Sequence, residues 1–305
     1  MTTPLVSIVL PTRNGTTTLP AVFEAIGRQR VAFPFEVIAV DSASTDGTAE
    51  WLRSRADRVI DIPAGTFDHG LTRNLGIEHA RGELIVLLVQ DAVPASDGWL
   101  AALTRPLLDD RSLAGTFARQ LPHSGASAIT RYYLSRWVAA SDAERISVVS
   151  NRAEFEALDP MSRFLRCAFD NVCSCIRRSV WAVHPFRSTP IGEDVEWAKA
   201  VLLDGHKLAY VPEAQVFHSH DRPASYEFHR TCVLHRRLHE LFGVRTIPTI
   251  PLLARAVATT VALHLRIEPS KAGRGIALAV AWPLGQYLGA LSAVKGWKPF
   301  RPGVV

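Results

Sequence analysis

FEVIAVDSASTDGT, residues 35–48, decides the fold of this chain. An apolar run ends at Asp41, a turn rich in Ser, Asp and Gly follows, and helical spacing begins at Thr48. Two other stretches end in the same way, SIVLPTRN (residues 7–14) and ELIVLLVQD (residues 83–91). Short apolar runs bounded by turn signals are typical of strands that are buried on both faces. The sequence therefore predicts buried strands with polar residues at their ends.

Helices are predicted between these strands. Apolar residues recur at helical spacing in residues 18–30, 48–55 and 71–80. Strands that alternate with helices predict right-handed βαβ units and a parallel sheet. Beyond residue 97 the pattern is less regular: helices are expected at 99–108 and 193–204, strands at 113–120, 171–177 and 207–220, and a helical tail from 224.

The composition excludes several classes of protein. Of the 305 residues, 48% are hydrophobic and 21% charged, which favours a packed globular protein over a disordered one. A net charge of +5 favours anionic partners, such as nucleotide sugars or an acidic membrane surface, and is too diffuse to predict a nucleic-acid partner. The four cysteines form no CxxC pair, so we expect reduced, buried thiols and a cytoplasmic protein.

Polar residues at the strand ends predict a site. Asp41 and Asp91 follow two strands whose carboxyl ends should share one edge of the sheet, where open α/β sheets bind ligands. Aspartate is also common in turns, so either residue alone could be structural. No GxGxxG or GxxxxGK[ST] follows the first strand, so a bound nucleotide would depend on side chains and a metal ion.

Five motifs in order carry a family resemblance. SIVLPTRNG, VIAVDSASTDGT, a strand that ends in Asp before Pro, IGEDVEWAKAVLLDG and VFHSH resemble the family 2 glycosyltransferases over residues 5–225. FDHGLTRNLG and VQDAVP resemble the rhamnosyltransferase branch of that family. The resemblance implies a GT-A fold, which is a Rossmann-like, mostly parallel sheet flanked by helices. We expect a catalytic domain at 1–225 and a helical C-terminal extension at 226–305.

The resemblance also implies a donor site for a nucleoside diphosphate sugar. Asp41 matches the position that contacts the nucleobase and ribose, although an Asx-turn is the alternative. Arg73, near the start of a helix, is expected to pair with a phosphate, whereas His69 could touch the donor or be a buried histidine. The expected donor-binding residues are Thr12, Arg13, Asn14, Asp41, Ser44, His69, Arg73, Gln90, Asp91 and Glu193.

A divalent cofactor, Mg²⁺ or Mn²⁺, is expected beside Asp91. The family's D-x-D motif reads Val89-Gln90-Asp91 here, so one carboxylate remains. One carboxylate can hold the ion if diphosphate oxygens, water and another side chain complete the shell. His218 matches the family's metal-contacting histidine and His220 is second, and the alternative is a hydrogen-bonded strand histidine.

Asp194 is the expected general base. The family match places it at the start of a helix, where an acid is also favourable as a cap. The adjacent Glu193 points about 100° away on a helix, so the two carboxylates cannot straddle one bond. One base and a diphosphate leaving group imply a single displacement with inversion.

The expected reaction is transfer of L-rhamnose from dTDP-rhamnose to a glycan or lipid-linked acceptor. A UDP- or GDP-hexose transferase and a non-catalytic nucleotide-sugar binder are the alternatives. Basic and apolar residues mix in the tail, which suits a membrane surface on the inner face of the plasma membrane, a homodimer interface or packing on the catalytic domain. Arg255, Pro283 and Gln286 interrupt the apolar stretches, so no spanning helix is expected.

Overall fold

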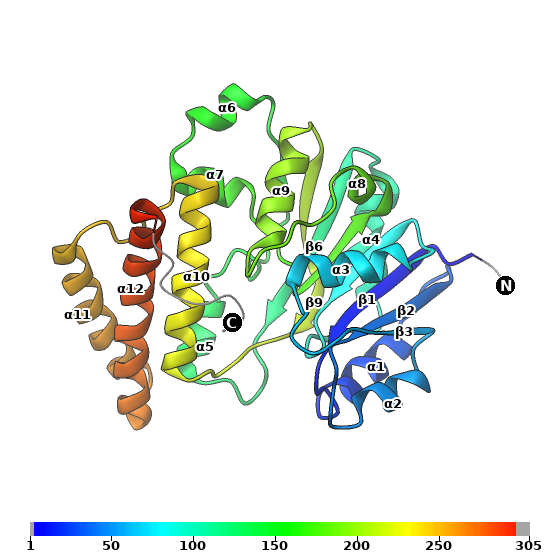
Figure 1. Cartoon of the computed structure of the whole chain (residues 1–305), viewed down its shortest axis with the longest axis horizontal. Helices are drawn as coiled ribbons and strands as arrows, with labels where there is room; N and C mark the ends of the chain where they lie inside the picture. The colour runs from blue at the N-terminus through cyan, green and yellow to red at the C-terminus, as the bar shows by residue number, and fades with distance from the viewer. Residues whose placement is uncertain (1–2, 297–305) are drawn as a thin grey trace.

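The computed structural model describes residues 3–296 and combines a central sheet, flanking helices and a C-terminal group of long helices (Figure 1). The strands lie in the order β3-β2-β1-β4-β8-β6-β9-β5, and β7 pairs with β9. Their bounds are β1 (Val6–Thr12), β2 (Phe35–Asp41), β3 (Arg58–Asp61), β4 (Leu84–Leu88), β5 (Val93–Pro94), β6 (Leu113–Leu121), β7 (Arg145–Ser147), β8 (Cys173–Arg177) and β9 (Lys207–Phe217).

The half of the sheet from β3 to β4 is parallel, as the strand and helix alternation predicted. β1, β2 and β4 are covered on both faces, which is why they are mostly apolar, whereas β3 at the edge of the sheet is partly exposed. Ile8 of β1 packs with α1 (Leu19–Gly27) on one face, whereas the next residue, Val9, packs with α3 (His69–Glu78) on the other. The carboxyl ends of β1 and β2 therefore meet at one edge, with Thr12 beside Asp41 in the register.

The other half of the sheet is mixed. β8 is antiparallel to both β4 and β6, and β9 is parallel to β6 but antiparallel to β5 and β7. The flanking helices are α1 (Leu19–Gly27), α2 (Thr48–Arg53), α3 (His69–Glu78), α4 (Trp99–Asp109), α5 (Ala128–Leu134), α6 (Arg152–Ala157), α7 (Pro160–Arg166), α8 (Arg178–Val183) and α9 (Glu193–Leu203).

Helix α3 begins two residues earlier than the spacing predicted. The Asp68 side chain is its N-cap, because Oδ1 accepts hydrogen bonds from the backbone N–H groups of Gly70 and Leu71, at 2.9 and 2.8 Å. A Cβ at Gly70 would lie 2.2 Å from the carbonyl oxygen of Arg187. The chain thus needs both an N-cap and a glycine here, and the hydrophobic period reports neither.

Three long helices form the C-terminal part: α10 (Ala224–Phe242), α11 (Ile250–Ile267) and α12 (Ala272–Lys295), with a short 3₁₀ turn, η1 (Pro269–Lys271), before α12. A Cβ at Gly289 of α12 would lie 2.3 Å from the carbonyl oxygen of Cys232, so small residues let α10 and α12 approach closely. Residues 297–305 of the expected extension lie outside the described residues.

Two helices of this part of the chain bear on the expectation that none spans a membrane. The most apolar 18-residue stretches of the helices at residues 250–267 and 269–295 have mean hydropathies of 1.4 and 1.3, so both helices are long and apolar enough to cross a membrane by length and composition. Pro283 lies within α12 without ending it. A packed core helix meets the same two criteria, and 44% of the second window is buried against 6% of the first.

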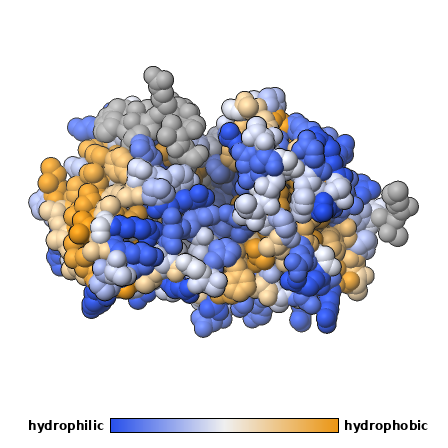
Figure 2. Space-filling model, turned by 90° about the horizontal axis from the view of Figure 1, so that it is seen from below, coloured by the Kyte–Doolittle hydropathy of each residue, from blue (hydrophilic) through white to orange (hydrophobic). Residues whose placement is uncertain are grey.

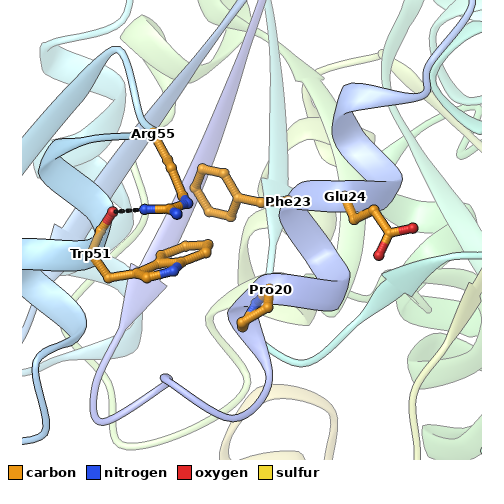
Figure 3. A pocket seen from close by; sticks show the side chains of 5 residues that line it. All are labelled: Pro20, Phe23, Glu24, Trp51 and Arg55. Carbon is orange, nitrogen blue, oxygen red and sulfur yellow. Dashed lines mark hydrogen bonds between the residues drawn. The ribbon is translucent and has the colours of Figure 1, made fainter.

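A shallow pocket of about 460 Å³ lies between α1 and α2 (Figure 3). Phe23 and Trp51 meet edge to face in its wall, and the Arg55 guanidinium stacks 4.4 Å from the Trp51 ring centre. The Arg55 side chain therefore covers one ring face with a cation–π contact. The remaining lining residues are Pro20 and Glu24, so the pocket contains none of the predicted site residues.

Candidate active site

Asp41 lies at the centre of a hydrogen-bonded network at the tips of β1 and β2. Its carboxylate accepts bonds from Thr12 Oγ1 at 3.1 Å, from the Ser44 N–H at 2.9 Å and from Ser44 Oγ at 2.6 Å. The residue is 1% exposed. The bond to the Ser44 N–H is the Asx-type turn contact that the sequence left open, so Asp41 shapes this turn whatever else it binds.

Asn14 and Gln90 extend the same network. The Asn14 N–H donates to Ser44 Oγ at 2.8 Å, and Asn14 Oδ1 accepts from the Thr45 N–H at 2.9 Å. Gln90 Oε1 accepts from the Arg13 N–H at 2.8 Å, while its Nε2 donates to the Arg13 carbonyl at 3.0 Å. The amide of Gln90 thus ties the tip of β4 to that of β1, and the side chain of Arg13 is exposed.

Asp91, His218 and His220 converge on one point. His220 Nε2 lies 3.3 Å from Asp91 Oδ2 and 3.1 Å from His218 Nε2, and His218 Nε2 lies 3.7 Å from Asp91 Oδ1. Their ligand atoms all lie within 4.8 Å of one another. One carboxylate oxygen and two imidazole nitrogens suit a first-row divalent ion, so these residues fit the predicted metal.

The histidines are in the protonation state that a metal needs. Burial lowers the pKa of His218 to about 4, partly opposed by the charge of Asp91, and burial also lowers the pKa of His220. Both rings are therefore neutral near pH 7, and neutral imidazole is the metal-binding form. The sequence had favoured His218 with His220 second, whereas the structure brings both to Asp91.

Gln120 and Asp170, which the sequence did not indicate, support His218. Gln120 Oε1 lies 3.0 Å from His218 Nδ1, and Gln120 Nε2 donates to Asp170 Oδ2 at 2.5 Å. Because an amide oxygen only accepts, His218 carries its proton on Nδ1 and leaves Nε2 free. Trp137 Nε1 also donates to Asp170 Oδ2, at 3.2 Å. Only the tertiary fold brings β6, β9 and the chain before β8 together here.

Asp194 lies in the first turn of α9, directly after Gly192 and Glu193. Gly192 has φ 80°, a left-handed conformation that favours glycine. Asp194 Oδ1 accepts from the Val195 N–H at 2.8 Å, and Oδ2 lies 3.4 Å from the Asn171 N–H. Burial first, and then the charges of Glu193 and Asp170, raise the pKa of Asp194 well above its ordinary value. A carboxylate with a raised pKa is a stronger base than free aspartate.

Arg73 takes part in a buried ion pair. Its guanidinium forms a 3.0 Å ion pair with Glu193, and the two side chains are 5% and 6% exposed. Asn171 Nδ2 lies 3.3 Å from the same Glu193 oxygen, and Arg73 Nη1 donates to the His69 carbonyl at 2.8 Å. Burial lowers the pKa of the neighbouring His69. The Arg73 side chain therefore lies beside Glu193 at the start of α9, and its contact with a phosphate stays a prediction.

Residues 7–144 match the family model for Glycosyl transferase family 2. This part of the chain is therefore similar to the family 2 glycosyltransferases. The chain is 29% identical over 229 residues to the O-antigen chain rhamnosyltransferase RfbN of Salmonella typhimurium, a match that covers 74% of this chain and 69% of that protein. It is also 29% identical over 231 residues to the O-antigen chain rhamnosyltransferase WbaN of Salmonella anatum, covering 74% and 70%.

Solved structures agree with the GT-A fold of this glycosyltransferase. The mannosyltransferase PcManGT from Pyrobaculum calidifontis, in complex with GDP-Man and Mn²⁺, aligns with a TM-score of 0.60 at 17% identity over 97% of this chain and 88% of that one. TarS of S. aureus in complex with UDP-GlcNAc aligns with a TM-score of 0.52 at 13% identity, over 97% and 93%. At 17% and 13% sequence identity, these similarities show a shared fold and nothing about the substrate.

Proposed function

We propose that this glycosyltransferase moves L-rhamnose from dTDP-rhamnose to a glycan or lipid-linked acceptor, with inversion, in the cytoplasm. The two O-antigen rhamnosyltransferases, matched over 74% of the chain, support the sugar and the kind of acceptor. The observation that carries the proposal is the convergence of Asp91, His218 and His220 beyond β4, linked through Gln120 and Asp170 to the segment that contacts Asp194.

The nucleoside is proposed to bind at the tips of β1 and β2. Asp41 keeps Thr12, Ser44 and Asn14 in a fixed network, and the exposed Arg13 lies beside them. A carboxylate of this kind can accept a charge-assisted hydrogen bond from the ring N–H of thymine or uracil. Since Gln90 bonds to the Arg13 backbone, its proposed part is to hold the Arg13 segment in place.

Asp91, His218 and His220 would hold Mg²⁺ or Mn²⁺. The mixed oxygen and nitrogen set favours Mn²⁺, because Mg²⁺ prefers oxygen ligands. When bound, such an ion neutralises charge on the donor's diphosphate. His218 is oriented for this by Gln120, and the neutral state of both rings requires no loss of a proton on binding.

Asp194 is proposed as the base that the displacement requires. The acceptor hydroxyl oxygen forms the bond to the anomeric carbon while the bond from that carbon to the diphosphate oxygen breaks. The hydroxyl proton passes to Asp194, and the nucleoside diphosphate leaves with the bonding pair. Glu193 and Arg73 hold the start of α9 through their buried ion pair, and Arg73 also donates a hydrogen bond to the His69 carbonyl.

The C-terminal helices are proposed to rest on the inner face of the plasma membrane. Large apolar side chains are exposed on α11 and α12: Ile250, Leu252, Leu265, Ile276, Val280 and Val294. Figure 2 shows hydrophobic residues gathered at the end of the molecule where these helices lie in Figure 1. The alternative is that a second copy of this chain covers this surface in a homodimer. We keep 1–225 and 226–305 as the proposed functional parts.

The experiment is a donor screen. Purified protein is incubated with dTDP-rhamnose, UDP-hexoses or GDP-hexoses, Mn²⁺ and lipid-linked acceptor, and transfer is followed by mass spectrometry. We expect transfer from dTDP-rhamnose only and a product of inverted configuration by NMR. Preferred transfer from a UDP- or GDP-hexose would replace the donor, and binding of a donor with no transfer to any acceptor would favour a non-catalytic binder.

A further inference from the structure

The donor's diphosphate needs more positive charge than the predicted site supplies. A divalent ion would bring two positive charges, but Asp91 already cancels one of them. Of the two arginines that the sequence offered for donor binding, Arg73 is paired with Glu193 and 5% exposed, and Arg13 lies at the tip of β1 beside the proposed nucleoside site. A further cation nearer the proposed metal ligands would have to come from another part of the chain.

Arg230 of α10 is placed to be that cation. It lies seven residues before Arg237, which is almost two helical turns, so the two side chains leave the same face of α10 about 10 Å apart. Arg237 contacts α9, because its Nη2 bonds to Glu196 at 2.5 Å and its Cγ lies 3.5 Å from where a Gly192 Cβ would be. The Arg230 side chain thus lies on the same face of α10 as Arg237, nearer to the N-terminus of α10 than the start of α9 is.

That N-terminus follows the metal-binding histidines directly, since α10 begins at Ala224, four residues after His220. Arg230 therefore lies along α10 between the proposed base at one end and the proposed metal ligands at the other. In Figure 1, α10 runs beside α9, between it and α12. The helix belongs to the C-terminal part of the chain, but this face is turned to the catalytic part.

The charge of Arg230 reaches the surrounding site residues. It contributes to the lowered pKa values of His218 and His220, and it acts in the same direction on His69. It also counteracts the effect of burial, which raises the pKa of Asp170. These four residues come from α3, the segment before β8 and the segment after β9. Arg230 is exposed, and within residues 3–296 it forms no ion pair of its own.

We propose that Arg230 binds the diphosphate of the donor and stabilises the negative charge that builds up on it as the sugar leaves. The inference rests on the proposed function, because it concerns the same donor. An exposed guanidinium is suited to phosphate oxygens, which it can bind with two parallel hydrogen bonds. α10 therefore completes the active site, so a catalytic part that ends at residue 225 lacks one of its functional groups.

Calorimetry on the full chain tests this inference. Wild type, Arg230→Ala, Arg230→Lys and the control Arg255→Ala, an exposed arginine of α11, are titrated with UDP, GDP and dTDP in the presence of Mn²⁺. The corresponding nucleosides are measured by competition. We expect Arg230→Ala to weaken the preferred nucleoside diphosphate about 10- to 100-fold, the range for a lost charged hydrogen bond, with the nucleoside unchanged. Arg230→Lys should lose less, and Arg255→Ala nothing.

The outcomes separate the inference from the proposed function. If wild type binds a nucleoside diphosphate and Arg230→Ala binds it equally well, Arg230 is no diphosphate ligand. Equal weakening of nucleoside and diphosphate would assign Arg230 a structural part and also overturn the inference. If wild type binds none of the three diphosphates, the proposed function fails first. Circular dichroism of each variant checks that it is folded.

Discussion

The two sides of the proposed site are built differently. At the tips of β1 and β2, side chains close a network among neighbours in the fold, and Asp41, Asn14 and Ser44 satisfy one another. Beyond β4, by contrast, Asp91 meets two neutral histidines from the far end of the sheet, and Asp194 lies near two other acids. The first region is stable without a ligand, whereas the second holds groups whose mutual contacts are unfavourable. Such groups are typical of functional sites.

The largest effect is expected at Asp194. Asp194→Asn keeps the shape but removes the base, so we expect kcat to fall by about 10²–10⁴-fold, with binding of the nucleoside diphosphate unchanged. Sugar transfer and calorimetry measure the two quantities. If transfer stays within about threefold of wild type, far below the range for base catalysis, Asp194 is only a helix cap.

The same residue gives a pH dependence. Because the pKa of Asp194 is raised in the folded protein, its charged form destabilises the fold, and this penalty is present above the folded pKa and absent below the unfolded one. Asp194→Asn should therefore raise the melting temperature near pH 7 to 8 and change it less at acidic pH. An equal change at every pH would contradict the buried charge.

Next in size is the ion pair behind the site. Arg73→Ala leaves Glu193 charged and buried, which typically costs about 3–5 kcal/mol of folding free energy. Chemical denaturation measures this loss of folding free energy. Arg230→Ala is the matched control for stability because it removes an exposed arginine. A loss of nucleotide affinity in Arg73→Ala without loss of stability would instead support the phosphate contact that the sequence predicted.

The nucleotide side is tested at Asp41. Asp41→Ala should weaken binding of the nucleoside diphosphate by about 1.5–3 kcal/mol, the scale of a charge-assisted hydrogen bond. Asp46 is the control, since it bonds Thr16 and Thr48 in the same loop region. If Asp46→Ala weakens binding as much as Asp41→Ala, the effect comes from loosening the turn.

A smaller effect is expected on metal affinity. Gln120→Leu removes the acceptor for His218 Nδ1, so we expect Mn²⁺ to bind about 10–100-fold more weakly. Calorimetry with Mn²⁺ alone measures this without turnover. Unchanged affinity in Gln120→Leu, together with loss in His218→Ala, would show that the ring needs no such support.

The smallest effect concerns the C-terminal helices. Ile250 is 68% exposed at the start of α11, and Ile146 of β7, 62% exposed, is its control. Ile250→Asp should weaken flotation with vesicles of phosphatidylcholine and phosphatidylglycerol by about 1 kcal/mol, and Ile146→Asp should not. Equal flotation of both variants and a shift from dimer to monomer in Ile250→Asp would instead favour the homodimer.

Local patterns predicted most of the parallel half of the sheet. The apolar run before Asp41 and the helical spacing after Thr48 are properties of a few neighbouring residues, and the structure has β2 and α2 there. The mixed half was predicted as separate strands without directions, because pairing of β8 between β4 and β6 joins segments far apart in the chain. Hydrophobic period says that a strand is buried but does not identify its neighbour.

The sequence by itself indicated the fold class and made Asp41, Asp91, Asp194, His218 and His220 candidate site residues, because each follows or begins an element that local pattern identifies. Only the tertiary structure decided which partners these groups have. It paired Arg73 with Glu193 and gave His218 its support from Gln120. The physical reason is that charge and hydrogen bonding act through space over a few ångströms, and the sequence does not specify which distant segments come that close.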